Sequence, residues 1–482
     1  MTLADPIHHI TGALREAFRE RWLFDLANRF SDAGQELVLV GGCVRDVFCP
    51  TPGRLSDIDL ATDAPPAQIT RLLTGWADAV WQIGAAYGTV GARRAGQTVE
   101  ITTYRSDVYH EDSRKPTVVF GTDLIRDLSR RDFTVNAMAV RLPSLELVDP
   151  HHGLADLHEG WLRTPVAPEV SFGDDPLRMM RAARFVSQLG LRAHPEVRAA
   201  MSRMAERITI VSAERIGEEF RRLLLGRDPR SGLELLTETT LAEYVLPELP
   251  ALQLQTDEHF RHKDIYEHTL TVLEQAIERE SDHHPTCGPD LALRLAALLH
   301  DIAKPATRRV ESDGAVSFHH HEVVGSRMAR KRLTALRYPT ALIDEVCLLI
   351  ELHLRFHGYR DGAWTDSAVR RYVRDAGDQL IRLHKLTRAD CTTRNPRKAA
   401  RLRSAYDALE RRIDELATTE QMNAIRPDLD GRAIMEILGI PPGPAVGAAY
   451  RFLLDRRLEQ GPGTEAEATT ALLAWWRDYE TG

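Results

Sequence analysis

The feature that constrains the chain most is a pair of glycines after a short apolar run, followed by two closely spaced aspartates. Leu37 to Val40 is typical of a buried strand, and Gly41 and Gly42 after it permit a positive φ and a close approach of backbone to a ligand. Backbone N–H groups in such a turn can cradle a phosphate. On the next strand, alternation places Asp57 and Asp59 on one face, with Cα atoms roughly 6.6 Å apart.

Two carboxylates at this spacing can hold a pair of Mg²⁺ ions, which take oxygen ligands from protein and from phosphate. Isolated Asp-x-Asp triplets are common in surface turns, so the strand and the paired glycines before them support the metal interpretation. Val99 to Arg105 is typical of a further strand, in which Glu100 has the period to face the carboxylates of a neighbour. A single polar residue on a half-exposed strand explains that period equally well. Glu100 is therefore the candidate third acidic group.

Length and composition exclude several classes of protein. A chain of 482 residues exceeds what one core supports, so we expect two to four domains. Apolar runs stay well short of the roughly 20 residues that cross a bilayer, and the N-terminus has no continuous apolar segment of a signal peptide. We expect no membrane partner and a cytoplasmic location. Five scattered cysteines favour reduced thiols, and the net charge of −8 leaves nucleic-acid binding to local basic patches.

The expected fold class is α+β, with a small mixed sheet at the N-terminus followed by an all-α remainder. The polar, Pro-terminated segment Asp107 to Pro116 predicts a mobile loop beside the site. After Gly153 the pattern is helical. The elements expected before it are a helix over about 6–33, a strand over 37–40, a helix over 66–73 and strands over 80–83, 88–92 and 99–105.

Two segments downstream are suited to bind a nucleotide. Arg130 and Arg131 place two cations before Asp132; arginines can grip phosphate oxygens bidentately and a carboxylate can accept from a ribose hydroxyl, although an ion-paired helix end explains the segment too. Asp175 and Arg178 are i,i+3 neighbours that would share one helix face. The amphipathic helix that contains residues 214–220 is expected to pack on theirs as a neck.

Asp175 and Arg178 present one acceptor and one donor side by side. Cytosine and adenine each offer an exocyclic amine beside a ring nitrogen, whereas uracil and guanine offer a carbonyl beside an N–H. The pair would therefore accept CTP and ATP and oppose UTP and GTP. An ordinary i,i+3 salt bridge on a basic helix is the alternative interpretation.

A different constellation follows in the C-terminal half. Imidazoles and carboxylates that converge from several helices suit a divalent transition metal, and an adjacent His-Asp can bridge two ions. Three histidines run together at 319–321, of which His321 is favoured because Gly325 follows it at a helix start; scattered surface histidines remain the alternative. The candidate ligands are His268, His300, Asp301, His321, His353 and Asp390. The basic run from Lys385 to Arg412 could track an RNA backbone or be a solvated helix face.

Five ordered motifs between about Leu37 and Leu225 carry a resemblance. They are Gly-Gly-x-Val-Arg-Asp, Asp-x-Asp, Arg-Arg-Asp-Phe-Thr-x-Asn-Ala, Asp-Pro-x-x-Gly and (Glu/Asp)-Asp-x-x-Arg. In this order they resemble the bacterial tRNA nucleotidyltransferases, or CCA-adding enzymes, and their poly(A) polymerase relatives. The resemblance implies a nucleotidyltransferase palm with Asp57 and Asp59 as Mg²⁺ ligands, Gly41, Gly42 and Arg45 near the triphosphate, Arg131 and Asp132 at ribose and phosphate, and Asp175 and Arg178 as the amino-acid template.

The nucleotide site is further expected to include Asn136, Arg181 and Arg184, which stand in the same motif segments. One departure from the family pattern is Cys43, where members often have Arg or Ala, which bears on local packing. The region from His268 to Asp390 resembles an HD-type phosphohydrolase domain, which implies phosphatase or phosphodiesterase activity.

We expect four domains: a nucleotidyltransferase head over 1–150, a helical neck over 151–250 for base selection and RNA binding, an HD-like metal domain over 251–392 and a helical, tRNA-binding tail over 393–482. The predicted function is addition of CCA to tRNA 3′ ends from CTP and ATP, without a nucleic-acid template. A poly(A) polymerase and an A-adding-only enzyme share the catalytic plan, and the strand at 99–105 favours the CCA-adding type over the former. A phosphohydrolase with an RNA-binding N-terminal half is the alternative from another class.

Overall fold

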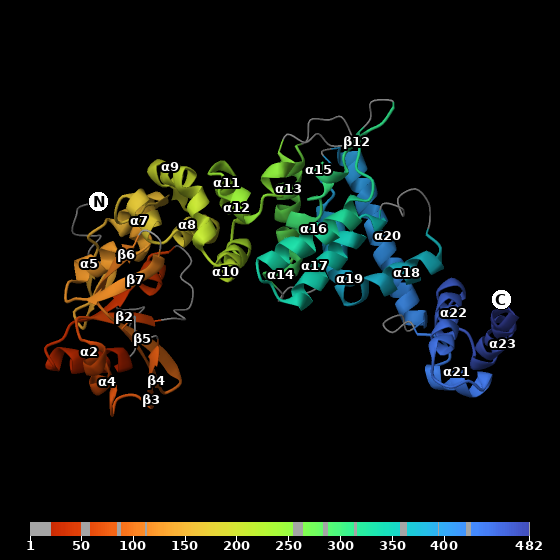
Figure 1. The fold of residues 1–482 in the computed structure, drawn as a ribbon, viewed down its shortest axis with the longest axis horizontal. Helices are drawn as coiled ribbons and strands as arrows, with labels where there is room; N and C mark the ends of the chain where they lie inside the picture. The colour runs from red at the N-terminus through yellow and green to blue at the C-terminus, as the bar shows by residue number, and fades with distance from the viewer. Residues whose placement is uncertain are drawn as a thin grey trace. The chain divides into compact units, whose positions relative to one another are not determined.

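The computed structural model describes residues 21–49, 58–83, 88–110, 113–253, 264–282, 288–312, 316–356, 364–393, 395–420 and 426–481. The chain divides into two compact units, Met1–Pro247 and Glu248–Gly482 (Figure 1). This boundary lies three residues before the one predicted between neck and body. The further division of each unit into head and neck, or body and tail, stays a prediction.

A seven-stranded mixed sheet organises the first unit, as the sequence predicts. Only β2 and β5 pair in parallel among these strands; their other neighbours run antiparallel. In the order in which they lie across the sheet, the strands are β3 (Ala79–Ile83), β4 (Thr89–Arg94), β5 (Gln97–Thr103), β2 (Ile58–Thr62), β1 (Leu37–Val40), β8 (Ala139–Leu142) and β9 (Glu146–Val148).

Strand β1, which lies between β2 and β8, is buried on both faces because its side chains alternate between two cores. Leu37 and Leu39 pack into a core that includes residues of α2 (Arg21–Asp32) and α4 (Pro66–Leu73). Val38 and Val40 pack on the other face against residues of α5 (Leu124–Ser129). Covered on both sides, the strand is a fixed base for the glycine turn that follows it. The first part of the helix expected over 6–33 lies outside the described residues.

The loop predicted over 107–116 is wrong. The chain there forms an antiparallel pair, β6 (Arg105–His110) and β7 (Ser113–Phe120), with Val108 opposite Thr117. The β-branched and aromatic residues of this segment favour strands, and they outweigh its charged residues. Pro116 is compatible with β7 because every strand of a two-stranded ribbon has an unpaired edge.

Helices follow the sheet in the first unit. Among them α8 packs against both α10 and α11, as expected for a neck. Their bounds are α6 (Gly153–Glu159), α7 (Pro168–Asp174), α8 (Leu177–Leu189), α9 (Pro195–Met204), α10 (Ala213–Leu224), α11 (Pro229–Glu238) and α12 (Ala242–Val245), with a short parallel pair of β10 (Trp161–Leu162) and β11 (Arg192–Ala193).

Asp175 does not lie on the helix of Arg178, contrary to the expectation of one shared helix face. It forms an extended link, with φ −139° and ψ 101°, between α7 and α8. The reason is Pro176, because the residue before a proline is disfavoured in the helical region. The two side chains therefore reach their positions from different local structures.

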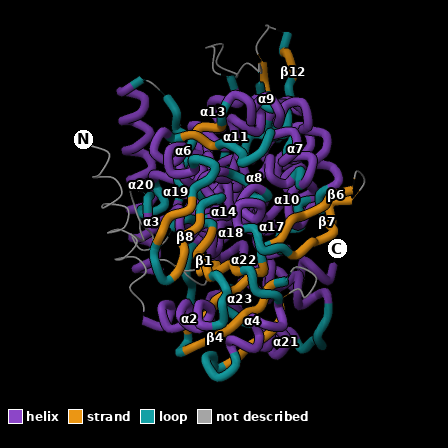
Figure 2. Tube along the Cα trace, turned by 90° about the vertical axis from the view of Figure 1, so that its left-hand side faces the viewer, coloured by secondary structure: helices purple, strands orange, loops and turns teal. Residues whose placement is uncertain are grey.

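The elements of the second unit in its described residues are helices and one two-stranded pair, β12 (Arg309–Val310) and β13 (Val316–Ser317) (Figure 2). No helix in the described part of the chain is long and apolar enough to cross a membrane. The helices are α13 (Ile265–Glu278), α14 (Leu291–Leu299), α15 (Lys304–Thr307), α16 (His321–Ala335), α17 (Thr340–Leu352), α18 (Asp366–Ala376), α19 (Leu380–Ala389), α20 (Pro396–Glu420), α21 (Gly431–Leu438), α22 (Pro444–Gln460) and α23 (Glu465–Thr481).

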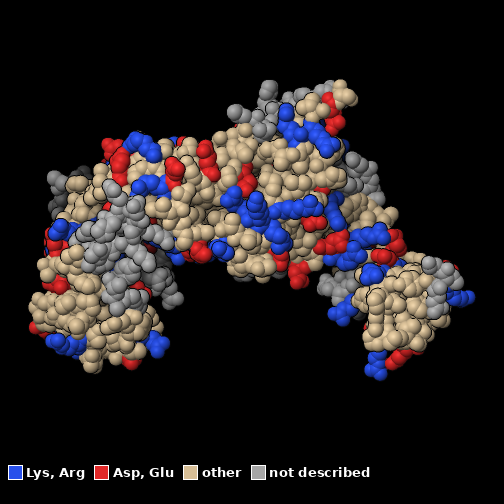
Figure 3. All heavy atoms as spheres, in the orientation of Figure 1, with Lys and Arg blue, Asp and Glu red and all other residues tan. Residues whose placement is uncertain are grey.

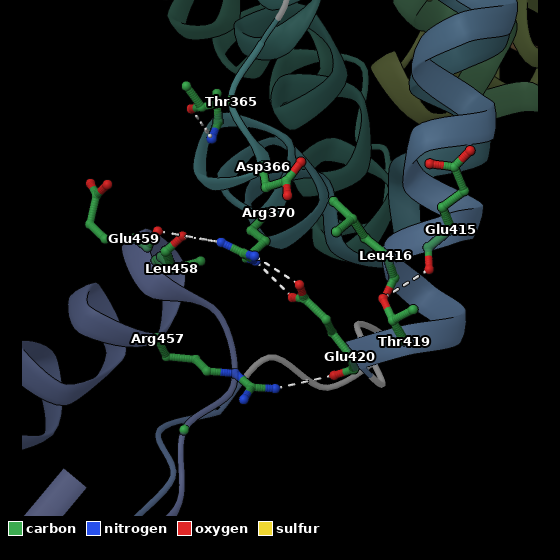
Figure 4. A network of polar contacts seen from close by, with 12 residues as sticks. Thr365, Asp366, Arg370, Glu415, Leu416, Thr419, Glu420, Arg457, Leu458 and Glu459 are labelled. Atoms are coloured by element: carbon green, nitrogen blue, oxygen red, sulfur yellow. Dashed lines mark hydrogen bonds and ion pairs between the residues drawn. The ribbon is translucent and has the colours of Figure 1, made fainter. Parts of the chain in front are cut away.

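A buried arginine joins three of these helices (Figure 4). Arg370 on α18 donates to both carboxylate oxygens of Glu420 at the end of α20, at 2.7 and 2.8 Å. Its remaining nitrogen donates to the backbone carbonyl of Leu458 on α22 at 3.1 Å. Arg457 also reaches the end of α20, through the carbonyl of Glu420. These contacts attach the C-terminal helices to the preceding body.

Candidate functional site

Two of the predicted acidic residues lie side by side on the sheet. Asp59 on β2 is in register with Glu100 on β5, and strand neighbours in register project to the same face. Both side chains are exposed, and the residue opposite Glu100 on β4 is Gly91, which has no side chain. Adjacent carboxylates repel one another unless a cation lies between them, so this pair suits a hard divalent cation. Asp57 lies outside the described residues.

The glycine turn beside this pair adopts the conformation that its sequence predicts. Gly41 has φ +77° and precedes α3 (Gly42–Val47), whose first N–H groups have no acceptor within the helix. A Cβ atom on Gly41 would stand 3.3 Å from Nη1 of Arg131. The Arg131 guanidinium therefore lies against the turn, held by Asp127 at 3.1 Å. Cys43 packs without strain, because it is buried and its Sγ is 3.3 Å from the carbonyl of Val40.

A chain of hydrogen bonds connects this turn to α8. Nη1 of Arg45 donates to Oδ1 of Asn136 at 2.6 Å, and Nδ2 of Asn136 donates to Oδ1 of Asp132 at 3.0 Å. Asp132 in turn accepts two hydrogen bonds from Arg181, one of them from Nε at 2.8 Å. Four predicted nucleotide-binding residues thus form one connected network, which we call the Asp132 network.

Asp132 is the centre of this network and is nearly saturated by it. Its oxygens also accept from the backbone N–H of Phe133, which makes four accepted hydrogen bonds. Burial raises the pKa of this carboxyl, but Arg181 and Asn136 outweigh burial and lower the pKa to about 2. These contacts indicate that Asp132 positions Arg45, Asn136 and Arg181. They leave little of its hydrogen-bonding capacity for a ribose hydroxyl.

Arg184 is placed differently from its predicted neighbours. It is 5% exposed, its Nη1 is 2.9 Å from Glu219 on α10, and it lies over the ring of Phe185. Burial, followed by the charge of Arg181, lowers its pKa to about 10. The contacts of Arg184 thus attach α8 to α10. The sequence carried a signal for Glu219, since a carboxylate within the apolar stripe of a helix requires a cationic partner.

Arg178 is held rigidly at the start of α8. Its side chain is buried, Nη1 donates to Oγ of Ser171 at 2.8 Å, and Nη2 donates to the carbonyl of Arg130 at 2.5 Å. Asp175 has separate partners: Oδ1 accepts from the N–H of Leu177 at 3.1 Å and Oδ2 accepts from Arg215 on α10, also at 3.1 Å. The acceptor Asp175 and the donor Arg178, three residues apart in the sequence, are thereby both fixed in place. Ser171 and Arg215 were not predicted, because sequence spacing does not reveal contacts between helices.

In the second unit, the six residues predicted as metal ligands converge, and we call them the His-Asp cluster. They form two groups, and within each group the ligand atoms lie within 4.8 Å of one another. Between the groups, Asp301 approaches His268 at 3.5 Å, His300 at 3.1 Å and His321 at 3.3 Å. The first group is His268, His300 and Asp390; the second is Asp301, His321 and His353. Because Asp301 lies between the two groups, its carboxylate could bridge two ions.

Three imidazoles of the cluster are oriented in the same way. Nδ1 of His300, His321 and His353 lies 2.6–2.9 Å from the backbone carbonyl three residues earlier in each case. A carbonyl only accepts, so Nδ1 carries a proton and each Nε2 faces the centre, where it can bind a metal ion or a second proton. Among the described residues, these three buried Nε2 atoms have no hydrogen-bond partner.

Lone pairs of imidazole facing carboxylate oxygens are unfavourable unless a cation or a proton lies between them. Burial lowers the pKa of His300, but Asp301 and Asp390 outweigh burial and raise it to about 10. Once a metal ion takes the place of that proton, the donor set of four neutral imidazoles and two carboxylates fits divalent transition metals. Lys304 adds a positive charge 2.9 Å from Asp301. His319 and His320 have side chains 68% and 83% exposed, so the structure brings only His321 of the three into the cluster.

Several cations of the basic run at 385–412 already have partners within the protein. Lys385 is buried and donates to the carbonyl of Glu280, Arg388 pairs with Asp407 and Glu410, and Arg412 pairs with Asp366. Arg397 and Arg401 are exposed on α20. On the face of the second unit in Figure 3, Lys and Arg gather over α14 to α17 with Asp and Glu among them. The run therefore has fewer exposed cations to offer an RNA backbone than its sequence suggests.

Three family models match consecutive parts of the chain. The "Poly A polymerase head domain" matches residues 37–163, the "Probable RNA and SrmB- binding site of polymerase A" matches 190–252, and the "HD domain" matches 265–395. The first covers the sheet with its glycine turn. The third covers all six residues of the His-Asp cluster.

Known proteins are similar over the same regions. The A-adding tRNA nucleotidyltransferase of Deinococcus radiodurans is 34% identical over 445 residues, which cover 91% of this chain and 95% of that protein. The CCA-adding enzyme of Lacticaseibacillus paracasei is 41% identical over 220 residues, which cover 45% of this chain and 54% of that enzyme. Similarity to the former therefore extends into the second unit.

Solved structures share the fold. The CCA-adding enzyme of Bacillus stearothermophilus in complex with CTP matches with a TM-score of 0.68 at 24% identity, over 96% of this chain and 99% of that one. A Thermotoga maritima CCA-adding enzyme complexed with tRNA matches with a TM-score of 0.59 at 18% identity, over 94% and 95% of the two chains. At such identities the likeness shows the fold alone.

Proposed function

Because the chain belongs to the family of A-adding and CCA-adding tRNA nucleotidyltransferases, we propose that it adds C, C and A to tRNA 3′ ends from CTP and ATP. The observation that carries this proposal is the fixed pair of Asp175 and Arg178. Nη2 of Arg178 donates to the carbonyl of Arg130, and the guanidinium of the next residue, Arg131, lies against the glycine turn. Base selection and phosphate binding then belong to one site within the first unit.

The phosphates of the incoming nucleotide bind at the turn between β1 and α3. Gly41 lets the backbone approach, and the Arg131 guanidinium beside it supplies the charge-assisted donors. Asp57, Asp59 and Glu100 would hold divalent cations, and bound Mg²⁺ would lower the pKa of the tRNA 3′-hydroxyl and neutralise the leaving pyrophosphate. Asp132 keeps Arg45 and Arg181 in place while the substrate changes from CTP to ATP.

The base is selected by an acceptor and a donor of the protein. Arg178 donates to the ring nitrogen and Asp175 accepts from the exocyclic amine, a pattern that cytosine and adenine share. Uracil and guanine bring a carbonyl to Asp175 and an N–H to Arg178, which leaves both protein groups unpaired. Because Arg178 is anchored by Ser171 and by a backbone carbonyl, it cannot turn away to accommodate the wrong base.

The test is incubation with tRNA that lacks its last three nucleotides, with each labelled nucleoside triphosphate supplied in turn. CTP alone should extend the tRNA by two residues, and ATP should then add one. Long tails from ATP alone would replace this proposal with poly(A) synthesis. Addition of A only to tRNA that already ends in CC would assign the chain the activity for which its Deinococcus relative is named.

A second activity is proposed for the His-Asp cluster. Six ligand residues, of which the carboxylate of Asp301 lies between the two groups with Lys304 beside it, favour metal-dependent hydrolysis of a phosphate ester. Lys304 would hold a phosphoryl oxygen, and Asp301 would share its carboxylate between the two groups of ligands. Hydrolysis of p-nitrophenyl phosphate and of its bis ester should require added transition metal and disappear in His353→Ala. Metal binding without hydrolysis of either ester would reduce the cluster to a structural site.

A further inference from the structure

The carboxylate of Asp175 is held by two donors from different elements. One oxygen accepts from the N–H of Leu177 at the start of α8, and the other accepts from Nη2 of Arg215 in the first turn of α10. Together they fix both the position of the carboxylate and the direction of its plane. Without Arg215, the outer oxygen would lose its only contact to α10 among the described residues.

This arrangement leaves room for a ligand on the same oxygens. Each carboxylate oxygen has two lone pairs, so an oxygen that already accepts from Arg215 can accept a second hydrogen bond. The Asp175 side chain is 21% exposed, so part of it faces solvent. An exocyclic amine can therefore bind without displacing Arg215.

We propose that Arg215 is a positioning residue for nucleotide selection, acting through Asp175; the proposal rests on base selection by Asp175 and Arg178. Arg178 has its own buried anchors, whereas the acceptor half of the pair depends on a partner from α10. Arg215 thus fixes the position at which the Asp175 carboxylate can accept a hydrogen bond from an exocyclic amine. Because its side chain is 45% exposed, the ion pair contributes little to folding, so its removal should affect selectivity more than stability.

The experiment compares kcat/KM for CTP against UTP and for ATP against GTP. Arg215→Ala should lower both ratios about tenfold, the effect of misplacing one charge-assisted hydrogen-bond partner. Arg215→Lys, which keeps one charged donor, should recover part of the loss. Arg222→Ala is the matched control, because Arg222 lies on the same helix, is 50% exposed and pairs with Glu218 instead. Thermal melting of each variant should match that of the wild type.

A double variant separates the possible failures. Asp175→Ala should abolish most of the selectivity, and Arg215→Ala should then add nothing further, since Arg215 would have no carboxylate to position. Unchanged selectivity in Asp175→Ala would overturn the proposed base selection itself. A loss in Asp175→Ala but none in Arg215→Ala would overturn only the role of Arg215. An additional loss from Arg215→Ala on the Asp175→Ala background would show that Arg215 acts by another route, which also overturns the proposal.

Discussion

At the scale of single residues, Asp132 shows how a buried carboxylate can organise a site. Its pKa of about 2 lies below the value of about 3.9 for an unfolded aspartate, so the folded state binds fewer protons. The stability it provides, about 2 kcal/mol, is complete above roughly pH 5 and is lost as the pH falls towards 2. Protonation would release Arg181 and Asn136 together.

We therefore predict that Asp132→Asn removes this acid dependence. The difference in free energy of unfolding between wild type and variant, from urea titrations at pH 7, 5, 4 and 3, should be constant above pH 5 and shrink below it. Glu196→Gln is the control, because that side chain is 78% exposed on α9. A difference that stays constant down to pH 3 would contradict the assignment.

The residue types of both sites followed from the sequence, but their partners did not. The six residues of the His-Asp cluster were predicted because imidazoles and carboxylates suit metals. The backbone carbonyls that orient three of them could not be read from the sequence, since any residue supplies a carbonyl. Arg184 pairs with Glu219 on α10, a contact that spacing along one helix cannot reveal, and its place at the nucleotide stays a prediction.

At the scale of elements, local rules predicted five of the seven strands of the sheet, missed β8 and β9, and failed at two further points. The segment over 107–116 is paired strand where its polar residues predicted a loop. Asp175 lies outside α8 because Pro176 follows it, which is a sequence signal that the i,i+3 spacing obscured. Both errors came from weighing side-chain polarity or spacing above backbone preference.

The junction of α18, α20 and α22 gives a prediction at this scale. The Arg370 side chain is 7% exposed and that of Glu420 is 12% exposed, so Arg370→Met leaves a buried carboxylate without its cation. We expect a loss of about 3 kcal/mol in the stability of the second unit. Pulse proteolysis in urea measures this loss, and Arg370→Met/Glu420→Leu should recover much of it. Arg432→Ala is the control and should leave stability unchanged, because the Arg432 side chain is 84% exposed. Equal losses of stability in Arg370→Met and Arg432→Ala would contradict the role of the junction.

At the scale of the whole molecule, the division into two units separates two chemistries. The sheet with the Asp132 network belongs to the first unit and the His-Asp cluster belongs to the second. The motifs of each site occupy one continuous stretch of the sequence, and the four domains expected from them stay a prediction.

Metal should therefore stabilise the second unit selectively. The buried Nε2 atoms of the cluster gain ligand bonds only in the folded chain, so added Mn²⁺, Co²⁺ or Zn²⁺ should raise the melting temperature of that unit. His353→Ala should weaken this response and reduce the metal content measured by elemental analysis. An identical response in wild type and variant would exclude the cluster as the metal site.

The central claim is that a protein acceptor and donor select the base, and Asp175→Asn tests it most directly. The substitution keeps the size of the side chain and replaces one acceptor oxygen with a donor amide. Measured as kcat/KM for the four nucleoside triphosphates on tRNA lacking its 3′ end, the wild type should prefer CTP and ATP. The variant should lose that preference and gain use of UTP and GTP. An unchanged preference for CTP and ATP would contradict the account.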